Sequence, residues 1–352
     1  MRRLPIYFLI DVSESMVGEP IKNVQLGMKE IIQELRTDPY ALESAYISII
    51  AFAGSAHQIQ PLIELSQFYP PLEYPIGSGT ALGCALDFLS SSIEREVMKN
   101  TTTQKGDFKP LIFLFTDGSP TDNYRAAFDR WNCKHRKGTN LVAVSIGDNV
   151  NTKILGQITE NVLLLKNTKA SDFRNFFKWV SQSIKASSMS VNDTGNDDLN
   201  LDRVSDFNIE VVDGNKDVMI DENFVVLHAK CSSTLKDYLS KYAKRFSIVT
   251  DGREQEFNSQ VFNAVGNYPI DSETYKKFSG PNSTNLNINA SALRDIRSCP
   301  HCGNQSGAVC SNCGNVFCVG FCQPAVICPW CKTELFLGEG GDSDFSINRT
   351  QG

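Results

Sequence analysis

Apolar runs alternate with segments of helical periodicity through the first half of the chain. Residues 4–10 form an uninterrupted apolar run, which is typical of a strand buried on both faces of a sheet. Residues 19–35 follow with apolar side chains three or four positions apart, the pattern of an amphipathic helix. The same alternation then predicts strands at 43–52, 58–65, 111–115, 141–146 and 162–165, and helices at 81–98, 122–137, 151–159 and 171–187.

Strands that alternate with helices favour a parallel α/β sheet covered on both faces. The strands at 43–52 and 58–65 are joined by Gly54-Ser55, which predicts a β-hairpin and therefore one antiparallel edge. We expect residues 1–190 to form a doubly wound, mostly parallel, Rossmann-like domain. In such folds the ligand site lies beyond the carboxyl ends of the strands.

The pattern becomes less regular after this domain. Residues 191–204 are polar and rich in turn-forming residues, which predicts a linker. Residues 205–297 contain short apolar alternations between Gly-, Asn- and Pro-rich stretches, and we expect a small α+β region with a helix at 234–245. The polar tail at 338–352 is expected to be disordered.

Charge and composition narrow the classes of function. The 352-residue chain is long enough for two or three domains, and its net charge of −6 argues against neutralisation of nucleic-acid phosphates. No apolar segment is long enough to span a membrane. The apolar run after Arg2-Arg3 ends at Asp11 without a small-residue cleavage site, which argues against a signal peptide. We therefore expect a cytoplasmic protein that binds neither membrane nor nucleic acid.

Polar side chains in three segments lie at the carboxyl ends of predicted strands or in the loops that follow them. Asp11, Ser13 and Ser15 follow the first strand, Thr80 precedes a helix, and Asp117 follows the strand at 111–115. Two carboxylates and three hydroxyls offer only oxygen ligands, which Mg²⁺ takes at about 2.0–2.1 Å. Hydroxyls are neutral, weak ligands, so the ion stays able to accept one more carboxylate from outside. We predict a Mg²⁺ site (or a Mn²⁺ or Ca²⁺ site) at Asp11, Ser13, Ser15, Thr80 and Asp117.

This constellation resembles the metal-ion-dependent adhesion site (MIDAS) of von Willebrand factor A domains, and the resemblance covers about residues 1–190. It implies that Ser13, Ser15 and Thr80 contact the ion directly. It also implies that Asp11 and Asp117 act directly or through water. In that family an acidic residue of a partner often supplies the sixth ligand, so the resemblance implies a protein-interaction site.

Eight of the eleven cysteines fall between Cys299 and Cys331, and they form four closely spaced pairs. Without a secretory signal, such clustering favours metal ligation over disulfides. Four pairs supply two tetrahedral Zn²⁺ sites, and in a segment as short as 298–337 metal binding must provide much of the stability. The remaining cysteines are interpreted as ordinary thiols: Cys84, Cys133 and Cys231.

The run from Cys310 to Cys318 resembles the centre of cross-braced, treble-clef zinc domains such as FYVE fingers. That resemblance implies that the first pair shares an ion with the third pair, and the second with the fourth. The expected ligands are Cys299, Cys302, Cys318 and Cys322 for one ion, and Cys310, Cys313, Cys328 and Cys331 for the other. Sequential pairing into two zinc ribbons stays open. His301 is not expected to bind an ion, because eight cysteines already satisfy two.

The order of these parts resembles the bacterial tellurite-resistance TerY family. Besides the two terminal motifs, the resemblance includes Ala229-Lys230-Cys231-Ser232 and Tyr268-Pro269-Ile270-Asp271 in the middle segment. Members of that family tend to be encoded beside a PP2C-type phosphatase and a Ser/Thr kinase-like protein, in systems tied to metal stress or phage defence. The resemblance implies a cytoplasmic scaffold for such phospho-signalling partners.

These features together predict a non-enzymatic, metal-dependent adaptor. A metal-dependent hydrolase is one alternative, but the sequence holds no Gly-X-Ser-X-Gly elbow and no phosphate-binding P-loop. A zinc module that binds nucleic acid is another. The charged residues between Cys299 and Phe336 are only Lys332 and Glu334, which counts against that interpretation.

Overall fold

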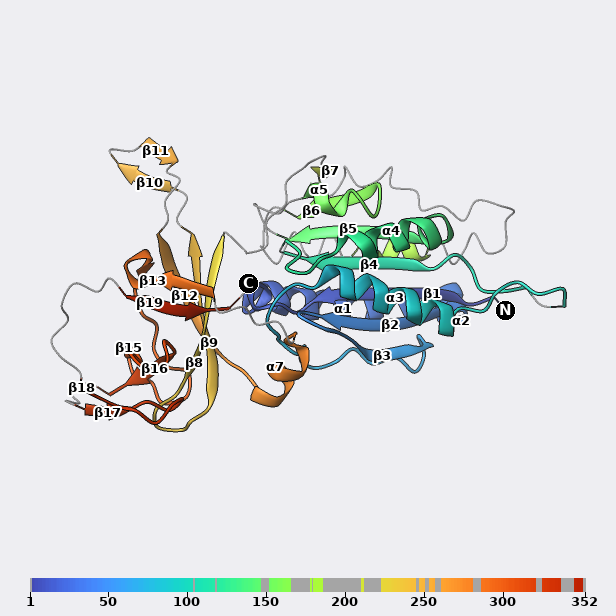
Figure 1. The fold of residues 1–352 in the computed structure, drawn as a ribbon. Coiled ribbons are helices and arrows are strands. Elements are labelled where there is room, and N and C mark those ends of the chain that lie inside the picture. The colour runs from blue at the N-terminus through green and yellow to red at the C-terminus, as the bar shows by residue number, and fades with distance from the viewer. Residues whose placement is uncertain are drawn as a thin grey trace.

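The computed structural model contains two parts, each built on one large β-sheet (Figure 1). The first sheet has seven strands in the order β3-β2-β1-β4-β5-β6-β7, and the second has six in the order β14-β12-β9-β8-β16-β15. The predicted linker at 191–204 lies outside the described residues. The structure describes residues 2–103, 105–117, 119–146, 152–165, 178, 180–185, 210–211, 223–244, 247–250, 253–256, 261–280, 286–320, 325–336 and 345–350.

The first sheet confirms the predicted mostly parallel architecture. Its centre is β1 (Leu4–Asp11), which pairs in parallel with β2 (Ala45–Phe52) on one side and β4 (Leu111–Thr116) on the other. The parallel order continues through β5 (Asn140–Ile146) and β6 (Asn161–Leu165). Both edges are antiparallel: β3 (Ala56–Glu64) pairs with β2, and β7 (Glu210–Val211) pairs with β6.

Helices cover both faces of this sheet. Four lie within the predicted helical segments: α1 (Glu19–Leu35), α3 (Leu82–Glu96), α4 (Arg125–Lys134) and α5 (Thr152–Leu155). Residues 178 and 180–185 are helical, within the segment predicted at 171–187. The short helix α2 (Pro39–Ser44) was not predicted. The Asp38 side chain starts it by accepting N–H bonds from Tyr40 at 2.9 Å and Ala41 at 3.1 Å.

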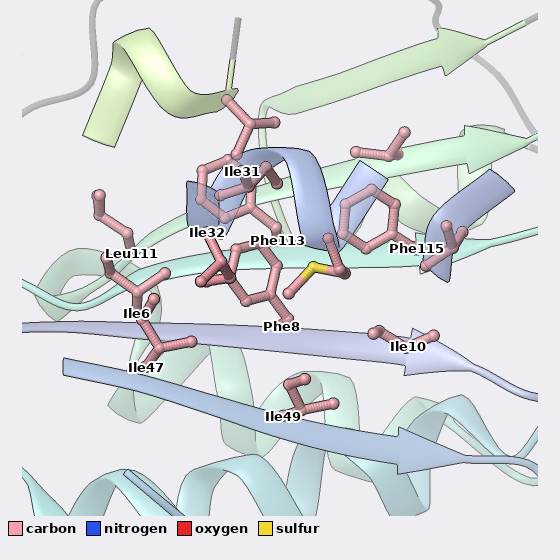
Figure 2. Close-up of a cluster of buried hydrophobic side chains, with 14 of the residues drawn as sticks. Ile6, Phe8, Ile10, Ile31, Ile32, Ile47, Ile49, Leu111, Phe113 and Phe115 are labelled. Atoms are coloured by element: carbon pink, nitrogen blue, oxygen red, sulfur yellow. The ribbon is translucent and has the colours of Figure 1, made fainter. Parts of the chain in front are cut away.

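Alternating side chains of the central strands fill a core on each face of the sheet. Ile6, Phe8 and Ile10 of β1 belong to the same core as Ile31 and Ile32 of α1, and Figure 2 shows side chains of this core. The intervening side chains point to the opposite core, which contains buried residues of α3 and α4. Every residue of β1 is buried, as expected for a strand covered on both faces.

The second sheet joins the region predicted at 205–297 to the cysteine segment predicted as a separate domain at 298–337. Within it, β8 (Phe224–Lys230) pairs in parallel with β16 (Val316–Val319), which in turn pairs with β15 (Ser306–Val309). The predicted boundary at 297/298 is therefore wrong. A segment this short buries too little apolar surface to stand alone, and pairing with β8 supplies the missing contacts.

The helix predicted at 234–245 is also wrong. Residues 237–244 form β9 (Asp237–Lys244), which lies between β8 and β12 (Phe262–Pro269) and pairs antiparallel with both. Hydrogen bonding to two neighbouring strands and burial of Leu239 outweigh any local helical preference here. A short parallel edge strand, β14 (Leu293–Arg294), completes this side of the sheet.

The predicted disorder of the tail at 338–352 is wrong for residues 346–349. They form β19 (Ser346–Arg349), which pairs antiparallel with β13 (Leu286–Asn289). Ile347 is buried in a core on the second sheet, and this burial explains the order of the segment. The remaining elements are η1 (Glu14–Met16), η2 (Arg136–Gly138), η5 (Ala290–Ala292), α7 (Ser272–Phe278) and two hairpins, β10–β11 (Ser247–Thr250, Arg253–Glu256) and β17–β18 (Ala325–Ile327, Glu334–Phe336).

The helix α7 belongs by sequence to the second part but packs on the first. Its last residue, Phe278, is a member of the core beneath α1 and lies with its ring 4.8 Å from the ring of His57. The same end of α7 reaches the loop after β2, where the Ser55 N–H donates to the Phe278 carbonyl at 3.1 Å. Within the described residues, no helix combines the length and the apolar character needed to cross a membrane.

Replacement of Phe278 by alanine tests whether α7 anchors the second part. Phe278 is 3% exposed, so we expect Phe278→Ala to lower the free energy of unfolding by about 3–5 kcal/mol, as for other buried phenylalanines. Phe336→Ala is the matched control, because Phe336 is 79% exposed and its loss should change stability by about 0.5 kcal/mol or less. Chemical denaturation measures both values. Equal stability of the two variants would contradict the packing of α7 on the first core.

Candidate metal centres

The first candidate centre begins where β1 ends. One carboxylate oxygen of Asp11 accepts the Ser13 N–H at 2.8 Å, and the other accepts the hydroxyl of Thr116 at 2.6 Å. The hydroxyls of Ser13 and Ser15 lie 2.9 Å apart. All of these groups are buried. Asp11 therefore fixes the loop so that both serine hydroxyls lie together at the carboxyl end of the sheet.

Asp117 enters the same cluster from the neighbouring strand. Since β1 and β4 run in parallel, with Ile10 opposite Phe115, the residues that follow them emerge side by side. The Ser15 hydroxyl donates to a carboxylate oxygen of Asp117 at 2.8 Å. The two predicted motifs, far apart in the sequence, are thus in direct contact.

The loop that carries Thr80 lies against both. Its Gly77 N–H donates to the Val12 carbonyl at 2.9 Å, which places it beside the first motif. Thr80 itself is buried and forms a reciprocal pair with Thr121: the Thr80 N–H donates to the Thr121 hydroxyl at 2.8 Å, and the Thr121 N–H donates to the Thr80 carbonyl at 2.9 Å. All five predicted residues therefore lie in three segments that hydrogen bonds hold together.

This donor set fits a hard divalent cation. The side chains offer carboxylate and hydroxyl oxygens only, and a bound cation offsets the cost of burying two carboxylates in one cluster. Asp11, Ser13, Ser15, Thr80 and Asp117 are the residues that would hold it. Thr116 and Thr121, whose hydroxyls position Asp11 and Thr80, were not predicted as site residues. Their position on either side of Asp117 was the available signal.

The second candidate centre contains the four cysteines predicted for one zinc ion. Their sulfur atoms lie within 4.8 Å of one another, with 3.5 Å between Cys310 and Cys331 and 3.9 Å between Cys313 and Cys328. Tetrahedral Zn²⁺ with Zn–S bonds of about 2.3 Å requires sulfurs about 3.8 Å apart. The spacing suits a zinc site, and none of these four cysteines forms a disulfide.

The third candidate centre corrects the interpretation of Cys231 as an ordinary thiol. Cys231 lies with Cys299, Cys302 and Cys318 in a second group of four sulfurs within 4.8 Å, and the Cys302 and Cys318 sulfurs are 3.5 Å apart. Cys322, predicted for this set, lies outside the described residues. The pairing of β8 with β16 explains the arrangement, because it places the residue after Lys230 beside Cys318.

Cys231 lies in the same type of turn as the Cys-X-X-Cys pairs. In that turn the N–H of the first cysteine donates to the carbonyl of the residue five positions later. The carbonyl of the same cysteine accepts a hydrogen bond from the N–H of the residue four positions later. Cys299, Cys310, Cys328 and Cys231 each make both bonds. In the Cys231 turn Thr234 occupies the place of the second cysteine, and its N–H donates to the Cys231 sulfur at 3.3 Å. The absence of that second cysteine hid the turn from the sequence analysis.

One thiol in each cluster has a pKa below its usual value, whereas burial raises the pKa of neighbouring thiols, those of Cys299 and Cys313 to about 12. Burial raises the pKa of Cys231, but hydrogen bonds from Thr234 outweigh this effect and lower it to about 6. In the other cluster, hydrogen bonding with Thr333 lowers the pKa of Cys331 to about 5. Zinc binds thiolates rather than thiols, so an ion at either cluster would have to displace protons from the remaining thiols.

Comparison with known families matches each half of the chain to a family model. Residues 6–182 match the model of the von Willebrand factor type A domain, and residues 221–352 match that of the TerY-C metal binding domain. The second match starts before β8 and includes both cysteine clusters, in agreement with the single sheet that joins them. No curated protein matches the chain.

Similar solved structures share little sequence with the chain. A von Willebrand factor type A protein from Catenulispora acidiphila is 12% identical, with a TM-score of 0.41, over 78% of this chain and 68% of its own. The PilB minor pilin from Streptococcus sanguinis is 15% identical, with a TM-score of 0.41, over 55% and 64%. Proximal thread matrix protein 1 from the mussel byssus, with a zinc-occupied MIDAS motif, is 18% identical, with a TM-score of 0.38, over 53% and 46%. The match thus spans about half the length of the mussel protein.

Proposed function

Because this chain belongs to the proteins that join a von Willebrand factor type A domain to a TerY-C metal-binding domain, we propose that it is a metal-dependent protein-interaction adaptor. The observation that carries the proposal is the contact between the motifs of β1 and β4, where Ser13, Ser15 and Asp117 form one buried oxygen cluster. Such a cluster suits Mg²⁺ better than a softer metal.

The cation would supply a Lewis-acidic position for a carboxylate of the partner. The neutral hydroxyls of Ser13, Ser15 and Thr80 are weak ligands, and they would leave the ion able to accept another carboxylate. Asp11 also keeps the loop closed through its bonds to Ser13 and Thr116. A partner would therefore be recognised by an acidic side chain at this edge of the sheet.

The two cysteine clusters have a structural role in this proposal. The cluster of Cys310 and Cys331 joins two neighbouring turns, and the cluster of Cys231 ties the end of β8 to β16. Zinc at these positions would hold the second sheet together, because closed four-cysteine sites leave no position for a substrate.

The proposed role is binding, without catalysis. The chain has four histidines, and each has a polar contact with a residue outside the five predicted cation ligands: His57 with Ser55, His135 with Glu94, and His228 and His301 with Asp237. On the basis of the TerY resemblance, the partners are a PP2C-type phosphatase and a Ser/Thr kinase-like protein, met in the cytoplasm during metal stress or phage defence.

Affinity purification of the tagged chain from native lysate in Mg²⁺ buffer tests the adaptor role. We expect wild type to retain a phosphatase or kinase-like protein, and both Thr80→Ala and Asp117→Ala to lose it, because each removes a predicted cation ligand. Asp87→Ala is the control, since Asp87 is a half-exposed carboxylate paired with Arg130. Mass spectrometry identifies what is retained.

Partners that persist on both ligand variants would place recognition elsewhere on the chain. A chelator is a poor substitute for these variants, because it would also remove zinc from the cysteine clusters.

A further inference from the structure

The part of the chain built on the second sheet, called the second domain from here on, contacts the loop that carries two of the predicted cation ligands. Glu14 lies between Ser13 and Ser15, and its side chain is buried. The hydroxyl of Tyr275, on α7, donates to one Glu14 carboxylate oxygen, and the Ser78 hydroxyl donates to the other at 3.2 Å. Burial raises the pKa of Tyr275 well above its usual value, so the phenol keeps the proton that it donates.

A second contact reaches the other end of the same loop. Lys241, on β9, is 4% exposed, and its ammonium group donates to the carbonyls of Ser15 and, at 3.2 Å, Val17. Two elements of the second domain, α7 and β9, therefore form hydrogen bonds with the turn between Glu14 and Val17. In Figure 1 the second domain lies at this end of the first sheet, with α7 beside it.

The loop that carries Thr80 is held from the same side. The Ser78 N–H donates to the Ser279 hydroxyl at 2.9 Å. A Cβ atom on Gly77 would lie 2.6 Å from the Cβ of Phe278, so only glycine allows this close approach. Both ligand-bearing loops thus depend on α7 for their position.

Aromatic contacts connect Tyr275 to the cysteine cluster that contains Cys328 and Cys331. The ring of His228 lies 4.9 Å from the ring of Tyr275 and 5.0 Å from that of Trp330, which stands between Cys328 and Cys331. The Trp330 indole N–H donates to the Val316 carbonyl at 2.9 Å, which fixes the ring on the second sheet. A continuous set of contacts therefore runs from this cluster to the loop of Ser13 and Ser15.

We propose that the second domain sets the cation affinity of the first, with Tyr275 and Lys241 as positioning residues for the loop at Glu14–Val17. This inference rests on the proposed cation site and adds its control by the zinc-binding domain. A loop ordered in advance binds its ion without a further loss of conformational entropy. By linkage, Mg²⁺ bound at the loop must in turn favour the docked position of α7.

Titration of the zinc-loaded full chain with Mg²⁺ tests the positioning role. We expect Tyr275→Phe and Lys241→Met each to weaken Mg²⁺ binding about 10-fold, within the usual range of coupling between sites. Tyr46→Phe is the matched control for the tyrosine, because the Tyr46 hydroxyl donates to Glu64 at 2.9 Å on the outer hairpin. Wild-type Mg²⁺ affinity in Tyr275→Phe and Lys241→Met, beside a wild type that binds Mg²⁺, would overturn this inference and leave the proposed function standing.

A double-mutant cycle separates positioning through Glu14 from general destabilisation. If Tyr275 acts through Glu14, the variant that combines Glu14→Gln with Tyr275→Phe should bind Mg²⁺ no more weakly than the weaker single variant. If the two losses of Mg²⁺ affinity multiply in the double variant, the two residues act independently. That result would overturn the inference that Tyr275 acts through Glu14.

Hydrogen exchange tests the coupling with Tyr275 and Lys241 left unaltered. We expect Mg²⁺ to slow exchange in α7 of the wild type, and to have no such effect in Asp11→Ala. Unchanged exchange in α7 on Mg²⁺ binding would overturn the coupling. A wild type that binds no Mg²⁺ would instead overturn the proposed function itself.

Discussion

Replacing Cys231 by serine is expected to reduce the zinc content from about two ions per chain to about one. Cys231 completes a group of four sulfurs with Cys299, Cys302 and Cys318, and a tetrahedral site that loses one thiolate binds zinc far more weakly. Elemental analysis of the purified protein, normalised to protein concentration, measures the change.

Two further serine variants make this test specific. Cys133→Ser is the control, since Cys133 is an exposed thiol outside both clusters, and it should keep about two zinc ions. Cys322→Ser tests the ligand set predicted from the treble-clef resemblance. Loss of zinc in Cys322→Ser with full zinc in Cys231→Ser would favour that set and contradict the cluster seen in the structure.

The Asp11→Ala variant should lose Mg²⁺ affinity by more than about 100-fold, the upper end of what loss of a supporting partner costs at a metal site. Asp11 contributes charge and also holds the loop through Ser13 and Thr116. Each of the two donors left without an acceptor should lower the free energy of unfolding by about 1–3 kcal/mol, which the domain core should tolerate.

Calorimetric titration with MgCl₂ measures this loss, and thermal unfolding shows whether the variant is folded. Asp87→Ala removes a half-exposed carboxylate from α3 and should bind Mg²⁺ as wild type does. A folded Asp11→Ala with unchanged Mg²⁺ affinity would show that the ion binds at another place.

Local patterns in the sequence determined the first domain and most of its site. The apolar run at β1 predicted a strand buried on both faces because burial depends on the side chains of that strand alone. The proximity of the predicted oxygen ligands has a similar origin: parallel strands end at one edge, so Asp11 and Asp117 emerge near each other. The grouping of Cys310 with Cys328 came from a family resemblance, and the structure places them together.

Tertiary contacts decided the rest of the second domain. The strand β9 forms because β8 and β12 pair with it on both sides, information that its own residues do not carry. Cys231 joins its cluster because β8 pairs with β16, which lies far along the chain. Likewise, Lys241 and Tyr275 contact the loop of Ser13 and Ser15 only through the packing of the two domains against each other. Local periodicity records which residues are buried, whereas the choice of neighbour depends on packing between segments that are distant in sequence.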